Sequence, residues 1–312
     1  MSAPRLALCV PAYNAGRFLP RLLRSAAAQH IPFDETLVYD DCSADDTAEV
    51  SARFGALVIR GGVNVGCSAG KNRLLQASTC DWIHFHDADD EMLPNFTTLA
   101  WRWLRSSEPV DVVLFDYQYR DNDTDELIAQ SDFSDVDLRA DPIRYAILHQ
   151  INPFCGVYRR SRLLQVGGYD LDPAILYNED VAFHCKLAVA GLRFAAEKEL
   201  SIINYRIKHS MSGANQVKCL KAHHQVMRKM ATNVGDRYAP EIASRLWAAA
   251  AGLASLGEWE AADEALADAF QLFPAIPHGN NRGFSRLCRV VGPRLAFRIR
   301  ERAIRVFKPG LR

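Results

Sequence analysis

The segment WIHFHDADDEMLP, residues 82–94, passes from an apolar run directly into a group of carboxylates. The run at 82–85 has the length and the bulky side chains of a buried strand. Four acids follow it: Asp87, Asp89, Asp90 and Glu91. Two like charges about 4 Å apart repel by roughly 4 kcal/mol at an effective dielectric of about 20. The cluster therefore needs a metal ion, basic neighbours or ready access to water.

A short apolar strand followed by a helix occurs four times in the first third of the chain. Strands are predicted at 5–10, 36–40, 56–59 and 82–85, and helices from Arg17 and over 45–54, 68–77 and 95–104. This alternation is typical of a parallel sheet with right-handed crossovers, and such sheets bind ligands outside the carboxyl ends of their strands. We therefore expect the polar residues at 11–14, 40–43 and 87–90 to meet at one edge.

The rest of the chain changes character twice. A further strand is predicted at 112–119, a loop or hairpin over 121–135, and weaker strands at 154–159 and 193–205, with a helix at 179–190 between them. From about 215 onward only helices are expected, including a pair over 248–274 that turns at Gly257. We predict a domain at 1–212, with halves of about 1–115 and 116–212, and a helical extension at 213–312.

Composition limits the classes of function. The 312 residues are 49% hydrophobic, and 37 Lys and Arg balance 37 Asp and Glu, so the overall charge predicts no nucleic-acid partner. The eight cysteines form no C-x-x-C pair, which favours reduced thiols in the cytoplasm. No signal peptide and no membrane-spanning segment are predicted. Neither a G-x-G-x-x-G nor a P-loop motif occurs, which argues against nicotinamide-dependent oxidoreductases and P-loop enzymes.

The segment 282–312 is strongly basic, with nine Arg, one Lys and a single acid, Glu301. Its apolar residues lie near one helical stripe, which Gly292-Pro293 should interrupt. Two interpretations stay open. The segment is either an amphipathic anchor on an anionic membrane at the inner face of the cell, or a solvated helix whose apolar stripe packs on the protein.

The DADD cluster taken alone has three interpretations. It is a divalent-metal site, since carboxylates suit Mg²⁺ and Mn²⁺. It is a phosphatase motif with Asp87 as nucleophile and Asp89 as acid. Or it is an acidic turn that caps the next helix. The phosphatase interpretation weakens because three strand–helix units precede the motif and Asp90 replaces the Thr or Val expected after the second acid.

Several segments together resemble the family 2 glycosyltransferases of the GT-A fold. The motifs are VPAYNAGRFLPRLLRS, VYDDCSADDT, NVGCSAGKNRLL and HFHDADDEMLP, in the order that the family has, and YNEDVAFHCKLAVAG and YRIKHSMS follow. The resemblance covers residues 5–212. It departs from the family at Cys42, where glycine is usual, and at Lys71, where the basic residue before Asn72 is usually Arg. It implies an α/β fold of GT-A type, Rossmann-like, with a mostly parallel sheet flanked by helices.

The resemblance also implies a set of residues that bind a nucleoside-diphosphate sugar. Asp40 and Asp41 would accept hydrogen bonds from the nucleobase, beside Tyr13 and the loop Pro11, Ala12 and Asn14. Lys71 would face the diphosphate as a point charge, and Arg73 would either contact the donor or pair with the aspartates. Asp87 with Ala88 would face the ribose. Asp89, assisted by His209, would hold Mn²⁺ or Mg²⁺.

On the acceptor side, Asp180 of the Glu179-Asp180 pair resembles the family's general base. A carboxylate within reach of the acceptor hydroxyl takes its proton during attack; the alternative is a charge that stabilises a helix N-terminus. The implied activity is inverting transfer, most simply from a UDP sugar, to a glycan or lipid-linked acceptor in cell-surface polysaccharide biosynthesis. A metal-dependent nucleotidyltransferase and a non-catalytic sugar-nucleotide-binding module remain alternatives.

Overall fold

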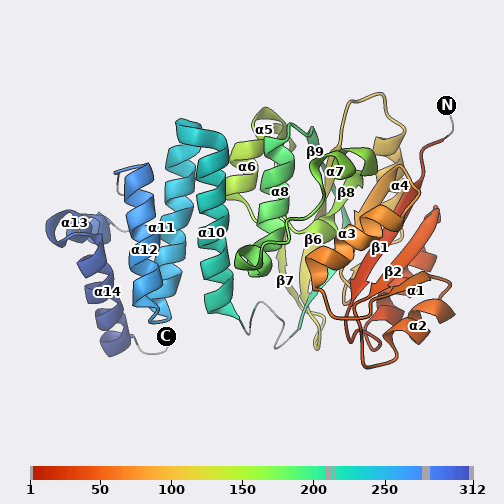
Figure 1. Ribbon diagram of the computed structural model, residues 1–312, viewed down its shortest axis with the longest axis horizontal. Coiled ribbons are helices and arrows are strands. Elements are labelled where there is room, and N and C mark those ends of the chain that lie inside the picture. The colour runs from red at the N-terminus through yellow and green to blue at the C-terminus, as the bar shows by residue number, and fades with distance from the viewer. Residues whose placement is uncertain (1–2, 208–212, 214, 276–281, 309–312) are drawn as a thin grey trace. The chain divides into compact units, whose positions relative to one another are not determined.

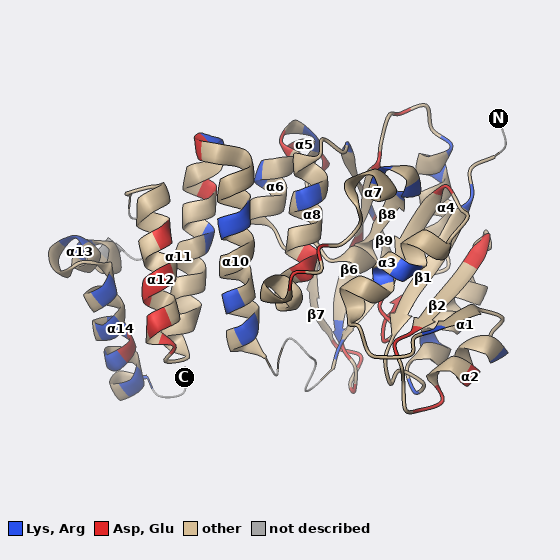
Figure 2. Ribbon diagram, viewed as in Figure 1, with Lys and Arg blue, Asp and Glu red and all other residues tan. Residues whose placement is uncertain are grey.

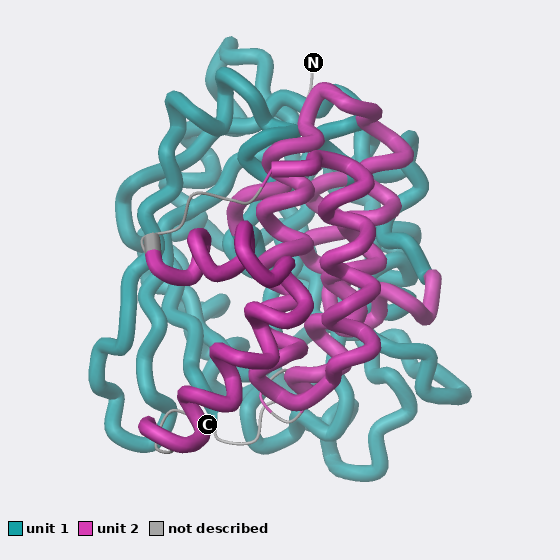
Figure 3. Tube along the Cα trace, turned by 90° about the vertical axis from the view of Figure 1, so that its left-hand side faces the viewer, with its two compact units in different colours: residues 1–146, 150–171, 186–210 teal, residues 147–149, 172–185, 211–312 magenta. Residues whose placement is uncertain are grey.

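The computed structural model describes residues 3–207, 213, 215–275 and 282–308 (Figure 1). The chain forms two compact units, which Figure 3 distinguishes by colour. The first unit takes in residues 1–146, 150–171 and 186–210, and the second takes in 147–149, 172–185 and 211–312. The division of the chain at residue 212 stays a prediction.

The first unit is built on one mixed sheet with the strand order β3-β2-β1-β4-β8-β6-β9-β5, to which β7 adds by pairing with β6. The first four of these strands run parallel, as the alternating pattern predicts. β8 is antiparallel to both of its neighbours, so the parallel order is interrupted there. The strands are β1 (Leu6–Ala12), β2 (Glu35–Asp40), β3 (Leu57–Arg60), β4 (Trp82–Phe85), β5 (Glu91–Met92), β6 (Val112–Asp121), β7 (Leu127–Gln130), β8 (Gly156–Arg159) and β9 (Phe194–Arg206).

The helices of this unit follow the strands closely. In α1, within the helix predicted from Arg17, the side chains of Leu19, Leu22, Leu23 and Ala26 are buried and form one apolar face. α3 lies against β1 and β2, and a Cβ on Gly70 would come within 3.0 Å of the Tyr39 ring, so glycine permits this close approach. The helices are α1 (Leu19–Ala27), α2 (Thr47–Arg53), α3 (Cys67–Ala77), α4 (Phe96–Leu104), α5 (Asp135–Ala140), α6 (Pro142–Leu148), α7 (Arg160–Val166) and the short η1 (Pro153–Cys155).

Two buried histidines in and after β4 are joined by hydrogen bonds. Nδ1 of His84 lies 2.8 Å from the Gly156 carbonyl oxygen, which can only accept, so this nitrogen carries the proton. Burial lowers the pKa of His84 to about 4, so the ring is neutral and its Nε2 accepts from Nδ1 of His86 at 2.9 Å. The pair thus satisfies three of its four ring nitrogens inside the core.

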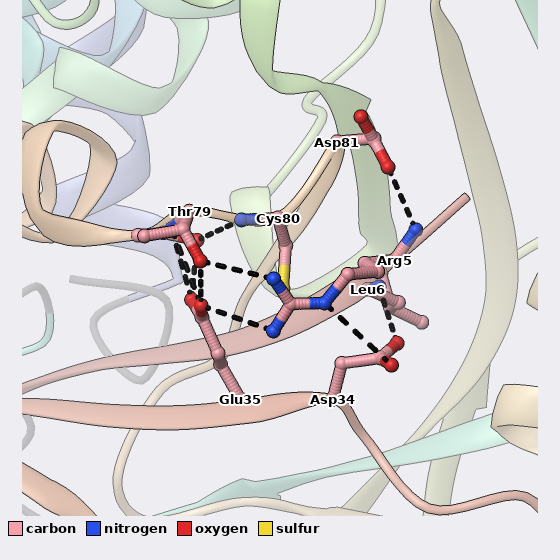
Figure 4. Close-up of polar contacts among 8 residues, drawn as sticks. Arg5, Leu6, Asp34, Glu35, Thr79, Cys80 and Asp81 are labelled. Carbon is pink, nitrogen blue, oxygen red and sulfur yellow. Dashed lines mark hydrogen bonds and ion pairs between the residues drawn. The ribbon is translucent and has the colours of Figure 1, made fainter. Parts of the chain in front are cut away.

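A polar network connects the amino-terminal ends of neighbouring parallel strands (Figure 4). Glu35 accepts a hydrogen bond of 2.9 Å from the Ser78 hydroxyl, further bonds from Thr79, and one of 3.3 Å from Arg5. Partial burial alone would raise the pKa of Glu35, but these donors outweigh it and lower the pKa. Glu35 therefore joins β1, β2 and the start of β4.

We expect Glu35→Ala to lower the free energy of unfolding by about 1–3 kcal/mol, because Ser78 and Thr79 lose their acceptor. Denaturant unfolding at pH 7 measures this loss. Glu49→Ala is the matched control: Glu49 pairs with Arg60 at 2.5 Å but is exposed, so its removal should change nothing measurable. Equal stability of the two variants would contradict the structural role of Glu35.

The second unit is helical in its described residues. α11 and α12 form the helix pair predicted over 248–274, and Gly257 between them has a φ of +83°. No helix among the described residues has the length and apolar character that crossing a membrane requires. The elements are η2 (Pro173–Asn178), α8 (Glu179–Val189, which continues into the first unit), α10 (Gln216–Val234), η3 (Gly235–Tyr238), α11 (Ala239–Ser255), α12 (Trp259–Leu272), α13 (Arg282–Val291) and α14 (Pro293–Phe307).

Candidate active site at the carboxyl ends of the strands

The loops that follow β1 and β2 are bonded to each other. The Asn14 amide N–H donates to the Ser43 hydroxyl at 2.9 Å, and the Asn14 side-chain oxygen accepts from Ala44 N–H at 2.9 Å. Asn14 thus joins the two loops, and its contact with a substrate stays a prediction. Tyr13 beside it is 54% exposed, so its ring is accessible to a planar ligand. Pro11 and Ala12 end β1 at the same edge.

Asp40 and Asp41 are both buried at the end of β2 and organise the neighbouring loops. The Asp41 carboxylate accepts from Val65 N–H and Gly66 N–H, both at 2.8 Å, and so holds the loop that leads into α3. Asp40 accepts from Ser43 N–H at 3.0 Å. An ionised carboxylate has about four acceptor positions, so Asp41 retains capacity for a further donor. Cys42 adopts a φ of +62°, a left-handed conformation that explains why glycine is usual there.

α3 carries three neighbouring polar residues that the structure places differently. Lys71 is buried, with its ammonium 5.2 Å from the centre of the Tyr169 ring, whereas Arg73 is exposed. Asn72 makes two bonds to the backbone of Tyr169, donating to its carbonyl at 3.0 Å and accepting from its N–H at 2.8 Å. A Cβ on Gly168 would lie 2.2 Å from the Asn72 oxygen, so the clamp requires glycine there.

The carboxylates after β4 divide into two kinds. Burial and then the charge of Asp87 raise the pKa of Asp89 to about 6. Asp90 is fully buried and accepts from Asn204 Nδ2 at 2.6 Å and Tyr205 N–H at 2.8 Å, while Glu91 accepts from the Tyr205 hydroxyl at 3.1 Å. The two later acids therefore fasten the end of β9. Neither caps α4, whose first residue follows Asn95.

Arg21 is a residue near this cluster for which the sequence predicted no role. Its guanidinium, on α1, donates to the Asp89 carbonyl oxygen and, at 3.1 Å, to the Asn122 side-chain oxygen at the end of β6. It also lies over the Tyr205 ring, 3.8 Å from its centre. Arg21 therefore fixes the backbone of Asp89 against the ends of two distant strands.

The residues present fit a divalent cation whose coordination a ligand completes. Within the described residues, neither Asp87 nor Asp89 forms an ion pair. The charge of Arg21 lowers the pKa of Asp89 in part, but burial and the charge of Asp87 outweigh it. Carboxylate oxygens are the donors that Mg²⁺ and Mn²⁺ prefer. The described parts of the chain contain no group of three His, Cys, Asp or Glu suited to a metal. One or two carboxylates plus phosphate oxygens are the usual arrangement for Mg²⁺.

The predicted acceptor-side carboxylates belong to the second unit. Asp180, the second residue of α8, is half-buried, and its carbonyl oxygen lies 2.8 Å from His184 Nδ1. Glu179 is buried. The pKa of Cys219 on α10 is raised, first by the burial of its own thiol and then by the negative charge of Glu179. Glu179 thus faces a helix of the same unit. His209 lies outside the described residues.

The strand order and the edge formed by the loops after β1, β2 and β4 define an α/β protein of the GT-A fold with a C-terminal helical region. The family model "Glycosyl transferase family 2" matches residues 7–166. The chain therefore belongs to glycosyltransferase family 2, as its motifs predict.

The chain is also similar to several curated proteins. The uncharacterized protein MT1568 of Mycobacterium tuberculosis is 27% identical over 219 residues, which are 64% of this chain and 66% of that protein. The chain spans 66%, 31% and 24% of the first three curated relatives it matches.

Two solved structures share the fold. S. aureus TarS 1-349 in complex with UDP-GlcNAc has a TM-score of 0.72 at 20% identity, covering 97% of this chain and 92% of that one. The mannosyltransferase PcManGT from Pyrobaculum calidifontis, in complex with GDP-Man and Mn²⁺, has a TM-score of 0.60 at 20% identity, covering 99% and 82%.

Proposed function

We propose that the protein transfers a glycosyl group from a nucleoside-diphosphate sugar, with a UDP sugar as the preferred donor, to a hydroxyl of a glycan or lipid-linked acceptor. The observation that carries the proposal is the convergence of Asp41, Asp87 and Asp89 at one edge of the sheet in a member of family 2. The complex of TarS with UDP-GlcNAc supports the choice of donor. Cell-surface polysaccharide synthesis is the proposed setting.

On the donor side, each residue has a role that its environment suits. Asp41, held by two backbone donors, accepts the imide N–H of the base, and the exposed Tyr13 lines the base pocket. Asp87 and Ala88 face the ribose, and Asp89 would hold Mn²⁺ or Mg²⁺. When bound, the cation would neutralise the charge that develops on the diphosphate leaving group. The PcManGT complex with Mn²⁺ supports the choice of cation.

The basic residues of α3 act differently from each other in this proposal. Arg73 is exposed and free to reach a diphosphate. Lys71 is buried against Tyr169, so it contributes positive potential to the donor site from inside the fold.

On the acceptor side, Asp180 takes the proton of the attacking hydroxyl as the bond to the anomeric carbon forms. Its partial exposure supports this role over Glu179, which faces α10. A single displacement of this kind inverts the anomeric configuration. The start of α8 is tied to α10 just before Glu179, because Asn178 Oδ1 and His223 Nδ1 lie 2.9 Å apart.

We expect a UDP sugar together with Mn²⁺ to raise the midpoint of thermal unfolding. At a ligand concentration about 100 times the Kd, the stabilisation is about 2.7 kcal/mol, which corresponds to roughly 5 °C. Thermal unfolding with a panel of nucleotide sugars, each with and without Mn²⁺, measures this shift. The best ligand should then release the nucleoside diphosphate when an acceptor glycan is added.

Nucleoside triphosphates with Mn²⁺ are the matched comparison. If a triphosphate stabilises the protein more than any nucleotide sugar, and pyrophosphate is released, the protein is a nucleotidyltransferase and the proposal is wrong. Stabilisation by a nucleotide sugar without turnover on any acceptor glycan would indicate a binding module.

A further inference from the structure

The last described helix, α14, has a buried face that packs within the second unit. Ala296 and Phe297 are buried, and the Phe297 ring lies 5.8 Å from Trp247 of α11 and 5.1 Å from Phe284 of α13, centre to centre. Glu301 is buried on this side and accepts from Arg300 at 2.9 Å. These contacts bury one face of α14 and hold the helix against α11 and α13.

The opposite face of α14 nevertheless carries aliphatic side chains. Leu295, Ile299 and Val306 are 48%, 43% and 64% exposed. Their spacing of four and seven residues places them on one stripe of a helix. The sequence left open whether the apolar stripe anchors the segment on a membrane or packs on the protein. Within the described unit these three residues of the stripe are exposed, so they do not pack on the protein. A helix whose outer face only meets water is normally polar there.

The outward face is also positively charged. Arg302 lies in the same stripe as the three aliphatic residues, and Arg294 is exposed in the first turn of the helix. Neither has an ion-pair partner among the described residues, while Arg298 is paired with Asp263 at 2.8 Å. Figure 2 shows basic positions along α13 and α14. Glu301 is the single acid in these two helices, and its side chain is buried.

We propose that the outward face of α14, formed by Leu295, Ile299, Val306 and Arg302, docks on an anionic phospholipid surface together with the exposed Arg294 of the first turn. The aliphatic side chains insert at the boundary between headgroups and acyl chains, and the guanidinium groups bind lipid phosphates. The 15-residue helix is roughly 22 Å long, which suits lying in the interface and is too short to cross it. Nucleic acid would pair with the arginines but gains nothing from three aliphatic side chains.

Sedimentation with lipid vesicles tests this surface on the full chain. Binding is expected to vesicles of equal parts phosphatidylcholine and phosphatidylglycerol, not to phosphatidylcholine alone, and should weaken as salt is added. Arg294→Gln with Arg302→Gln should weaken binding roughly 30-fold. Leu295→Ser with Ile299→Ser and Val306→Ser should weaken it roughly 100-fold. All five positions are exposed, so the thermal unfolding midpoint should stay unchanged.

Matched substitutions elsewhere provide the controls. Leu127→Ser with Ile128→Ser and Val136→Ser removes three aliphatic side chains that are 55%, 46% and 77% exposed, and should leave vesicle binding intact. Arg53→Gln with Arg60→Gln does the same for charge. Equal binding to neutral vesicles, no binding to either kind, or unchanged binding by both α14 variants would overturn the proposal. So would a dimer that the same α14 substitutions dissociate.

Discussion

Asp180→Asn is expected to lower kcat by roughly 10²- to 10⁴-fold while donor affinity stays unchanged, because an amide cannot take the proton of the acceptor hydroxyl. The substitution preserves size and shape at the start of α8. It removes a negative charge near a helix N-terminus, which changes stability by at most about 1 kcal/mol. Steady-state transfer rates and titration of the donor separate the two effects.

Two comparison variants sharpen the test. Glu179→Gln should retain more activity than Asp180→Asn, since the Glu179 carboxylate is buried against α10. Asp236→Asn makes the same chemical change at an exposed position of the same unit and should behave as the unaltered protein. If Asp180→Asn keeps full turnover while Glu179→Gln abolishes it, the base is Glu179.

The positions of Asp41, Asp87 and Asp89 at one edge of the sheet follow from local patterns in the sequence. Short apolar strands alternating with helices predict parallel order, and parallel strands bring their carboxyl ends to the same side. The insertion of β8 between β4 and β6 is not predictable in this way. Its four residues carry no periodicity that distinguishes parallel from antiparallel pairing.

The residues that support the site were not predictable because their partners are distant in sequence. Arg21 contacts Asp89, Asn122 and Tyr205, which follow it by 68 to 184 positions. On α1 it is simply a polar residue between two apolar ones. In the sequence Asp90 likewise looks equivalent to Asp89. In the structure, however, its carboxylate accepts hydrogen bonds from two residues of β9 and so holds the end of that strand in place.

The affinity for Mn²⁺ is expected to fall as the pH is lowered through about 6. Burial and the charge of Asp87 raise the pKa of Asp89 to about 6, so below this pH a proton occupies the carboxylate that would hold the cation. Above pH 7 the affinity should be constant, and each unit below about 5.5 should cost roughly tenfold. Calorimetric titration of Mn²⁺ in the presence of UDP, between pH 5 and pH 8, measures the profile.

Asp89→Asn should remove both the pH dependence and the metal-dependent part of donor affinity, a loss on the order of 100-fold, because the neutral amide lacks the charge that binds the cation. Asp236→Asn again serves as control, since it lies in the other unit and should keep the pH profile. Arg21→Gln tests whether the hydrogen bond from Arg21 to the Asp89 carbonyl oxygen positions Asp89 for the cation. With the Asp89 carboxylate intact, it should weaken Mn²⁺ affinity less than Asp89→Asn does. Full metal-dependent affinity in Asp89→Asn would place the cation elsewhere and leave the raised pKa of Asp89 without a role in donor binding.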